Sequence, residues 1–265
     1  MPTIRYDRRV KRLIVTADDF GVSSAVNEAV EDAHRRGILS AASLMVTGDA
    51  AADAIARAKR LPLLGVGLHL VLVDGRPQLP PEQVPDLVDA DGRFSNALAA
   101  AGARLYFTSA ARRQAAAEIR AQLLAFRATG LPLDHVNAHH HFHFHPVVRD
   151  ILLALAPEFG IRAVRLPREP RLSPTNAVVA PFVGALRRKL DRAGIVHNDW
   201  EFGLTDNGAM TATRIAASLA RLPEGVTELY SHPSSGNTEH AALIDPAVVA
   251  RVRELGLAPI PFAAL

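Results

Sequence analysis

Ionisable side chains stand at the ends of four apolar segments that lie far apart in the sequence. These side chains are Asp18, Asp19, His69, His139 and His232. One carboxylate and two imidazoles offer an oxygen and two nitrogens, which suits a divalent metal ion that keeps positions open for water and substrate. We therefore predict a catalytic site for one divalent ion, zinc or magnesium, with Asp19, His69 and His139 as ligands. Asp18 would then be free to act as a base, unless one of the two aspartates caps the helix expected from Ser24.

Five of the chain's 11 histidines are crowded into the run AHHHFHFH, residues 138–145. The run is internal and interrupted, which distinguishes it from an affinity tag. Side chains of a strand alternate between two faces, so His139 and His141 are expected on the same side as His135. His139 ends the expected strand and is the predicted ligand, while His141 is the next side chain on that face. A histidine tract for metal storage is the competing interpretation.

A repeated strand-then-helix pattern surrounds these side chains. Apolar and β-branched runs predict strands at 12–17, 40–46, 64–70, 133–139, 162–166, 227–232 and 257–260. Helical spacing predicts helices at 24–36, 49–60, 110–129, 146–159, 210–222 and 245–255. Such alternation favours a parallel α/β sheet, and we expect a (β/α) barrel-like fold, a distorted or incomplete TIM-type barrel of about seven strands. An open doubly wound sheet is the alternative, but no glycine-rich phosphate loop follows the first strand.

The predicted sheet would bring the ionisable side chains together. In parallel α/β folds the carboxyl ends of the strands share one rim, and functional residues gather there. Two long insertions, at about residues 74–109 and 167–209, leave from the same rim and could wall a substrate cleft. We expect residues 1–265 to form a single domain.

Composition limits the class of protein. The 265 residues are 49% hydrophobic, which is enough for one large core. The absence of cysteine excludes a disulfide framework and thiolate metal ligands. The net charge is +3 without a long basic block, and aromatic residues are only 5%, which argues against nucleic-acid binding. Neither a transmembrane run nor a signal peptide is evident, so we expect a cytoplasmic protein.

Several motifs resemble the YdjC-like carbohydrate deacetylase family over nearly the whole chain. These motifs are LIVTADDFGVSSAVNEAV, GLHL, HVNAHHHFH and the late SHP. Within the family, ASLMVTG, VGLHLVLVDGRP, LDHVNAH and AVRLPREP are most similar to the hopanoid-biosynthesis deacetylases (HpnK). The resemblance implies a barrel-like fold and a divalent metal ion held by Asp19, His69 and His139. It further implies Asp18 as the general base and His232 as the acid.

One position departs from the family pattern. Many members have Asp-Ser before the first histidine of the run, whereas this chain has Asn137 and Ala138. A carboxylate close to the metal ligands is therefore absent, which argues against a direct transfer of chitooligosaccharide activity.

The reaction that the resemblance implies is hydrolysis of the N-acetyl group of an N-acetylglucosaminyl substrate, with a hopanoid glycolipid as the expected form. Arg165 and Arg168 are expected to orient Asp18 or bind sugar hydroxyls, and His141 to support the substrate, with salt-bridge or structural roles as alternatives. Residues 177–190 (AVVAPFVGALRRKL) mix apolar and basic side chains and could rest on the inner face of an anionic membrane. A helix packed on the barrel is the alternative. The sequence does not indicate an oligomeric state.

Three other functions compete with this hypothesis. A deacetylase of soluble chitooligosaccharides would use the same residues. A histidine-cluster metal-binding protein would hold several ions per chain and have no use for Asp18. A barrel hydrolase of phosphoesters could also use paired aspartates and histidines.

Overall fold

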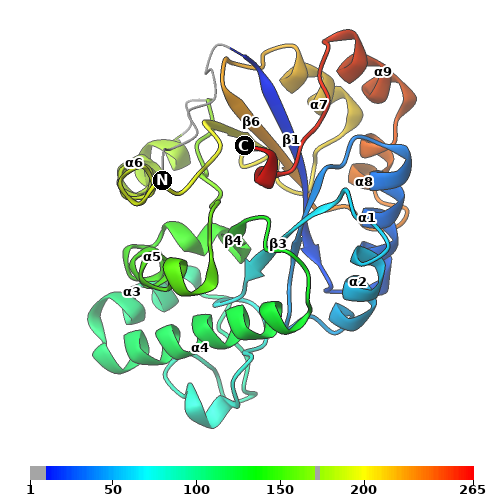
Figure 1. Ribbon diagram of the computed structural model, residues 1–265. Coiled ribbons are helices and arrows are strands. Elements are labelled where there is room, and N and C mark those ends of the chain that lie inside the picture. The colour runs from blue at the N-terminus through cyan, green and yellow to red at the C-terminus, as the bar shows by residue number, and fades with distance from the viewer. Residues whose placement is uncertain (1–9, 171–173) are drawn as a thin grey trace.

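A computed structural model describes residues 10–170 and 174–265 of the chain. Its centre is a parallel sheet in the order β4-β3-β2-β1-β6-β5. The sheet is curled into a half-barrel with helices around its outside (Figure 1). The strands are β1 (Arg12–Phe20), β2 (Ala41–Leu44), β3 (Gly65–Leu70), β4 (Val136–Ala138), β5 (Trp200–Phe202) and β6 (Val226–Ser231). The prediction of a parallel α/β fold is thus confirmed.

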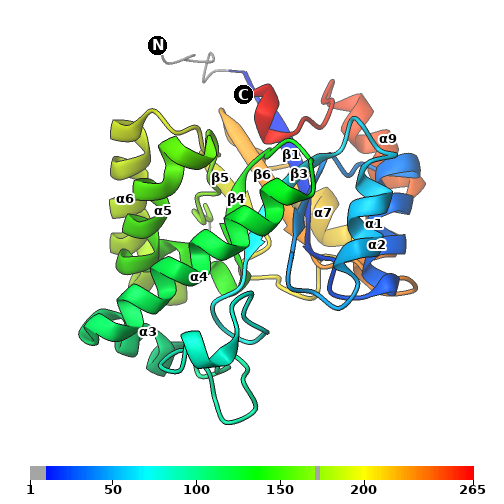
Figure 2. The same ribbon diagram turned by 60° about the horizontal axis from the view of Figure 1, so that its bottom comes forward.

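The helices form two groups on either side of the curled sheet, as Figures 1 and 2 show. Helices α1, α2 and α8 pack together on one side, and α4, α5 and α6 on the other. The α-helices are α1 (Ser24–Arg36), α2 (Ala51–Ala58), α3 (Leu98–Phe107), α4 (Ser109–Ala128), α5 (Pro146–Phe159), α6 (Pro174–Ala193), α7 (Ala212–Leu219), α8 (Thr238–Leu243) and α9 (Pro246–Glu254). Three 3-10 segments are η1 (Pro81–Gln83), η2 (His139–Phe144) and η3 (Phe262–Ala264). No helix in the described part of the chain is both long and apolar enough to cross a bilayer.

Local sequence explains the first strand and helix. The apolar run of β1 is fully buried, as expected of a strand covered on both faces of a parallel sheet. Helix α1 begins where the Ser23 hydroxyl accepts a hydrogen bond from the backbone N–H of Val26. It ends at Gly37, where a Cβ atom would lie 2.2 Å from the carbonyl oxygen of Leu243. Glycine is therefore the residue that lets α1 end against α8.

The expected seven-stranded TIM-type barrel is not formed by the described residues. The segment 162–166 makes only two isolated parallel bridges, Val136 with Val164 and Ala163 with Val196. The pairing stops because the Asn198 side chain, rather than a neighbouring backbone, accepts from Leu166 N and donates to Leu166 O.

Two further differences concern the ends of the sheet. The expected last strand, 257–260, is not a strand, since Pro259 and Pro261 supply no N–H to a ladder and only Ile260 bonds to β1. Strand β5 lies inside 167–209, so this segment is not only an insertion but also supplies an edge strand of the sheet. The insertion at 74–109 contains η1, all of α3 and the start of α4, with Val88 and Phe94 forming an antiparallel bridge.

Candidate metal and catalytic site

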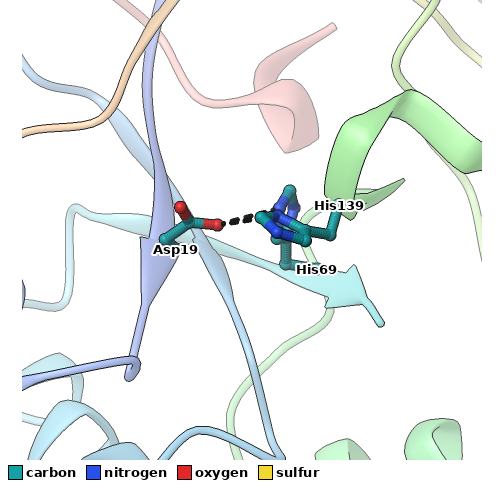
Figure 3. Close-up of side chains that lie close together, drawn as sticks. All are labelled: Asp19, His69 and His139. Atoms are coloured by element: carbon teal, nitrogen blue, oxygen red, sulfur yellow. Dashed lines mark ion pairs between the residues drawn. The ribbon is translucent and has the colours of Figure 1, made fainter. Parts of the chain in front are cut away.

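The three predicted metal ligands converge at the carboxyl ends of their strands (Figure 3). Asp19 lies near the end of β1, His69 near the end of β3, and His139 directly after β4. Asp19 Oδ1 is 3.3 Å from His69 Nε2 and 3.2 Å from His139 Nδ1. The three donor atoms all lie within 4.8 Å of one another, so that a single cation could contact all of them.

Four residues with left-handed backbone conformations line the pocket of the predicted ligands. The pairing of β1 with β2 shifts register between Ala17 and Phe20, and Asp19 within this irregular stretch has φ +62°. Among the described residues, the non-glycine positions with positive φ are Asp19, Asp74, His140 and His141. All four line the same pocket of about 270 Å³, together with the other predicted ligands. Such conformations are unfavourable for side-chain-bearing residues, and their gathering at one pocket is typical of a functional site.

The chemistry of the donors fits a divalent cation. Asp19 Oδ1 and His69 Nε2 are buried and have no hydrogen-bond partner, although buried polar atoms are nearly always paired. Burial alone would raise the pKa of Asp19, but His139 and His69 hold this pKa far below its usual range. Asn137 Oδ1 lies 2.7 Å from His69 Nδ1, so that Nε2 is the nitrogen that faces Asp19. Burial alone would lower the pKa of His69, but the Asp18 and Asp19 carboxylates raise it, so a metal ion would displace a proton from this ring, since carboxylates bind metal ionised and imidazoles bind it unprotonated.

Asp18 lies beside this cluster and is held by Arg165. The guanidinium makes two hydrogen bonds to the Asp18 carboxylate, Nη1 to Oδ2 at 2.5 Å and Nη2 to Oδ1 at 3.0 Å. Asp18 is only 2% exposed, and burial would raise the pKa of its carboxyl, but Arg165 and then His69 hold it well below its usual range. Asp18 is therefore an ionised acceptor at neutral pH. Of the two roles expected for Arg165, the geometry supports the orientation of Asp18.

Arg165 is itself surrounded by acidic side chains that the sequence analysis did not single out. Glu228 accepts two hydrogen bonds from the guanidinium, at 2.7 and 3.0 Å, and Glu201 lies 3.3 Å from Nε. The Tyr230 ring packs against the guanidinium, 4.8 Å from Arg165 Cζ. Arg165, Glu201 and Glu228 are fully buried, so this group of charges lies behind Asp18 rather than in the pocket.

His232 and His141 lie on the wall of the pocket. His232 follows β6 directly, and its ring makes an edge contact with the ring of Tyr230. His141 Nε2 is 3.1 Å from the Tyr230 hydroxyl. Burial, followed by Arg165 and His143, lowers the pKa of His141 well below its usual value, so His141 is neutral at pH 7. Tyr230 faces the pocket two residues before His232, and this spacing on the strand is the signal that could have identified it.

The histidine run does not continue as a strand. Strand β4 ends at Ala138, and η2 begins at His139, because His140 and His141 take left-handed conformations. His140 therefore reaches Asp74, with His140 Nε2 and Asp74 Oδ2 3.3 Å apart. Asp74 follows the third predicted strand, 64–70, by four residues and was not among the predicted ligands. The last two histidines of the run, His143 and His145, do not line the pocket.

Those two histidines have local contacts instead. His143 is fully buried and donates from Nε2 to the carbonyl oxygen of Arg165. His145 precedes α5 and accepts a hydrogen bond from the backbone N–H of Val147. Arg168 also lies outside the pocket of the metal ligands: it stacks on Trp200, with Cζ 4.0 Å from the ring, in a second pocket beside α6.

Fold and site together define a parallel α/β protein with a candidate divalent-metal centre at the carboxyl edge of its sheet. Residues 12–256 match the family model of the YdjC-like proteins, and the chain belongs to this family. It is 36% identical to a carbohydrate deacetylase of Brevibacillus brevis, over 84% of this chain and 81% of that protein. It is 33% identical to a carbohydrate deacetylase of Geobacillus stearothermophilus, over 94% and 96% of the two chains.

A solved structure has the same fold. The crystal structure of an Enterococcus faecalis protein, whose name proposes a role in cellobiose-phosphate cleavage, matches with a TM-score of 0.77. The match covers 96% of this chain and 98% of that chain at 24% sequence identity. At this identity the likeness describes the architecture alone.

Proposed function

We propose that this protein is a metal-dependent carbohydrate N-deacetylase, which hydrolyses the N-acetyl group of an N-acetylglucosaminyl substrate. The observation that carries the proposal is the convergence of Asp19, His69 and His139 on one point beside the ionised Asp18. The relatives named carbohydrate deacetylases support the same reaction class.

Five residues of the pocket have a task in this reaction. A divalent ion, zinc or magnesium, held by Asp19, His69 and His139, would polarise the acetyl carbonyl and lower the pKa of water. Asp18, fixed by Arg165, takes the proton of the attacking water as the new C–O bond forms. His232 gives a proton to the departing nitrogen as the C–N bond breaks. The products are acetate and a free amine.

We further propose an N-acetylglucosaminyl glycolipid of the hopanoid type as the substrate, as the subfamily motifs imply. The pocket of about 450 Å³ beside α6, lined by Val179, Val183 and Trp200, offers an apolar surface for a lipid. Val178 and Phe182 are exposed on the same helix, which supports a peripheral contact with a membrane. A soluble chitooligosaccharide is the second candidate, favoured by the carbohydrate deacetylase relatives.

The experiment that tests the proposal compares two substrates. The protein is stripped with a chelator, reloaded with zinc or magnesium, and incubated with an N-acetylglucosaminyl lipid or with chitobiose. Mass spectrometry should detect the loss of one acetyl group only from the lipid and only after metal is restored. Loss from chitobiose alone would assign the soluble substrate, and no loss from either would refute a deacetylase.

The alternative of a metal-storage protein predicts several ions per chain. The contacts of His143 with Arg165 and of His145 with Val147 argue against a tract in which every histidine binds metal, while Asp74, His139 and His140 form a second group whose ligand atoms lie close together. Elemental analysis of the reloaded protein distinguishes the two, since the deacetylase should hold one ion per chain.

A further inference from the structure

We propose that a buried series of side chains, Asp134, His135, Ser43 and Asn137, acts as a positioning relay for the candidate metal site. The relay sets the tautomer of His69 and holds Asp18. The inference rests on the proposed function and identifies residues that support its ligand and its base. Each link is a hydrogen bond between side chains that are 5% exposed or less.

The relay is anchored at Asp134, near the C-terminal segment. The Asp134 carboxylate accepts hydrogen bonds from the backbone N–H groups of Phe262 and Ala263, at 3.2 and 2.7 Å. Its Oδ2 also lies 2.8 Å from His135 Nδ1. A carboxylate in this position only accepts, so the proton of the imidazole is on His135 Nδ1. In the neutral ring, His135 Nε2 is then an acceptor.

This acceptor determines the directions of the next two bonds. Ser43 Oγ lies 3.0 Å from His135 Nε2 and therefore donates its proton to it. The same Oγ accepts from Asn137 Nδ2 at 2.9 Å. The second Nδ2 proton is donated to Asp18 Oδ1 at 3.2 Å. The orientation of the Asn137 amide, which heavy-atom positions alone leave ambiguous, is thus set by its partners.

The orientation of the Asn137 amide determines which ring nitrogen of His69 carries the proton. With Nδ2 committed to Ser43 and Asp18, Asn137 Oδ1 faces His69 Nδ1 at 2.7 Å and accepts its proton. His69 Nε2 is left without a proton in the neutral ring, and it is the atom aimed at Asp19. Groups that hold the second nitrogen of a metal-binding histidine orient the ring and increase the affinity for the metal.

The amide gives residue 137 both a hydrogen-bond acceptor and a hydrogen-bond donor. A carboxylate at residue 137 would still accept from His69 Nδ1, but it would have no proton to donate to Asp18. Asn137 therefore serves the metal ligand and the general base at once, and the departure from the family's aspartate is functional rather than a lost group.

The order of Asp134, His135 and Ser43 resembles a nucleophilic triad, but their surroundings do not allow that role. Ser43 is fully buried in β2, so no substrate can reach its hydroxyl. His135 is stacked on Phe262, with ring centroids 4.6 Å apart. A Cβ at Gly67 would lie 2.5 Å from the His135 ring. The tight packing immobilises the ring, which suits positioning.

The test measures metal affinity by isothermal titration of the stripped full-length protein with Zn²⁺. Asn137→Leu removes the acceptor of His69 and should weaken binding about 10–100-fold. Asn137→Asp retains that acceptor but has no N–H for Ser43 or Asp18, so its affinity should lie between those of wild type and Asn137→Leu. Ser43→Ala removes a hydrogen bond of Asn137 without changing a metal ligand, and should weaken metal binding about tenfold. Ser40→Ala is the matched control, because Ser40 is buried and hydrogen-bonded to Val15 and Ile260 but not to the relay.

Two results would overturn the relay. One is wild-type affinity in Asn137→Leu, and the other is an equal loss of affinity in Ser43→Ala and Ser40→Ala, which would indicate a general packing effect. A second measurement needs no metal: ¹⁵N NMR of the stripped protein at alkaline pH should show His135 with its proton on Nδ1. A proton on Nε2 would overturn the relay. If wild type binds no metal, the proposed function fails while the NMR result still decides the relay.

Discussion

Replacing the buried Glu201 by glutamine should stabilise the protein at neutral pH. Arg165 is the shared partner of three carboxylates, those of Asp18, Glu201 and Glu228. Asp18 and Glu228 each accept two hydrogen bonds from the guanidinium, whereas neither oxygen of Glu201 has a hydrogen-bond partner. Burial raises the pKa of Glu201 well above its usual value, and the nearby Glu228 and Asp18 carboxylates add to the effect against the opposing charge of Arg165.

The sign of the effect on stability follows from proton linkage. The folded protein keeps a proton on Glu201 at pH values where the unfolded chain, with an ordinary pKa of 4.5, has released it. The free energy of unfolding therefore falls as the pH rises from about 4.5 toward the raised pKa, with a slope of at most about 1.4 kcal/mol per pH unit for one proton. Glutamine cannot ionise, so Glu201→Gln should lack this slope.

Urea unfolding of wild type and Glu201→Gln at pH 5 and pH 8, with chelator present, measures the difference. The free energy of unfolding of Glu201→Gln should exceed that of wild type by more at pH 8 than at pH 5. Glu228→Gln is the control, because Glu228 accepts from both Arg165 and the Thr16 hydroxyl, and its loss should cost about 3–5 kcal/mol at both pH values. If Glu201→Gln is no more stable than wild type, or is more stable by the same free energy at both pH values, the reasoning is refuted.

Four other substitutions test the site, the buried histidine and the surface. Asp18→Asn should keep its metal and lose about 10²–10⁴-fold in turnover, whereas Asp19→Ala should lose both metal and turnover. Titration calorimetry measures the metal, and product analysis measures the turnover. Loss of metal from Asp18→Asn would mean that the two aspartates have exchanged roles. Burial, then Arg165, lowers the pKa of His143 to about 3, so wild type should lose stability as the pH falls from about 6.5 to 3. His143→Gln should have a flatter curve of unfolding free energy against pH, and parallel curves would contradict this. Phe182→Asp should reduce co-sedimentation with anionic liposomes; equal sedimentation would remove the proposed membrane contact.

Much of the fold could be predicted from local periodicity. The strands around Arg12–Ala17 and Leu64–Leu70 and the long helix α4 were identified because each buries an apolar pattern of its own. Strand β5 was missed because it has only three residues and a glutamate at its centre. The expected strand at 162–166 was not formed because the Asn198 side chain interrupts the backbone pairing, which no local pattern indicates.

The candidate site was predictable where it depends on topology. Parallel strands place their carboxyl ends on one rim, so Asp19, His69 and His139 could be grouped without coordinates. Their roles as ligands stay a prediction until metal is measured. Glu201 and Glu228 could not be assigned, because their importance comes from Arg165, which reaches them only after the sheet has curled.

The sequence by itself determined the parallel α/β class, the residues of the rim and the departure at Asn137. Only the tertiary structure decided what that asparagine does. Its amide bonds Ser43 and Asp18, which are 94 and 119 positions away in the sequence, and through Ser43 it is tied to His135 and Asp134. Hydrogen-bond direction depends on which atoms face one another across neighbouring strands, and periodicity along a single strand carries no information about those partners.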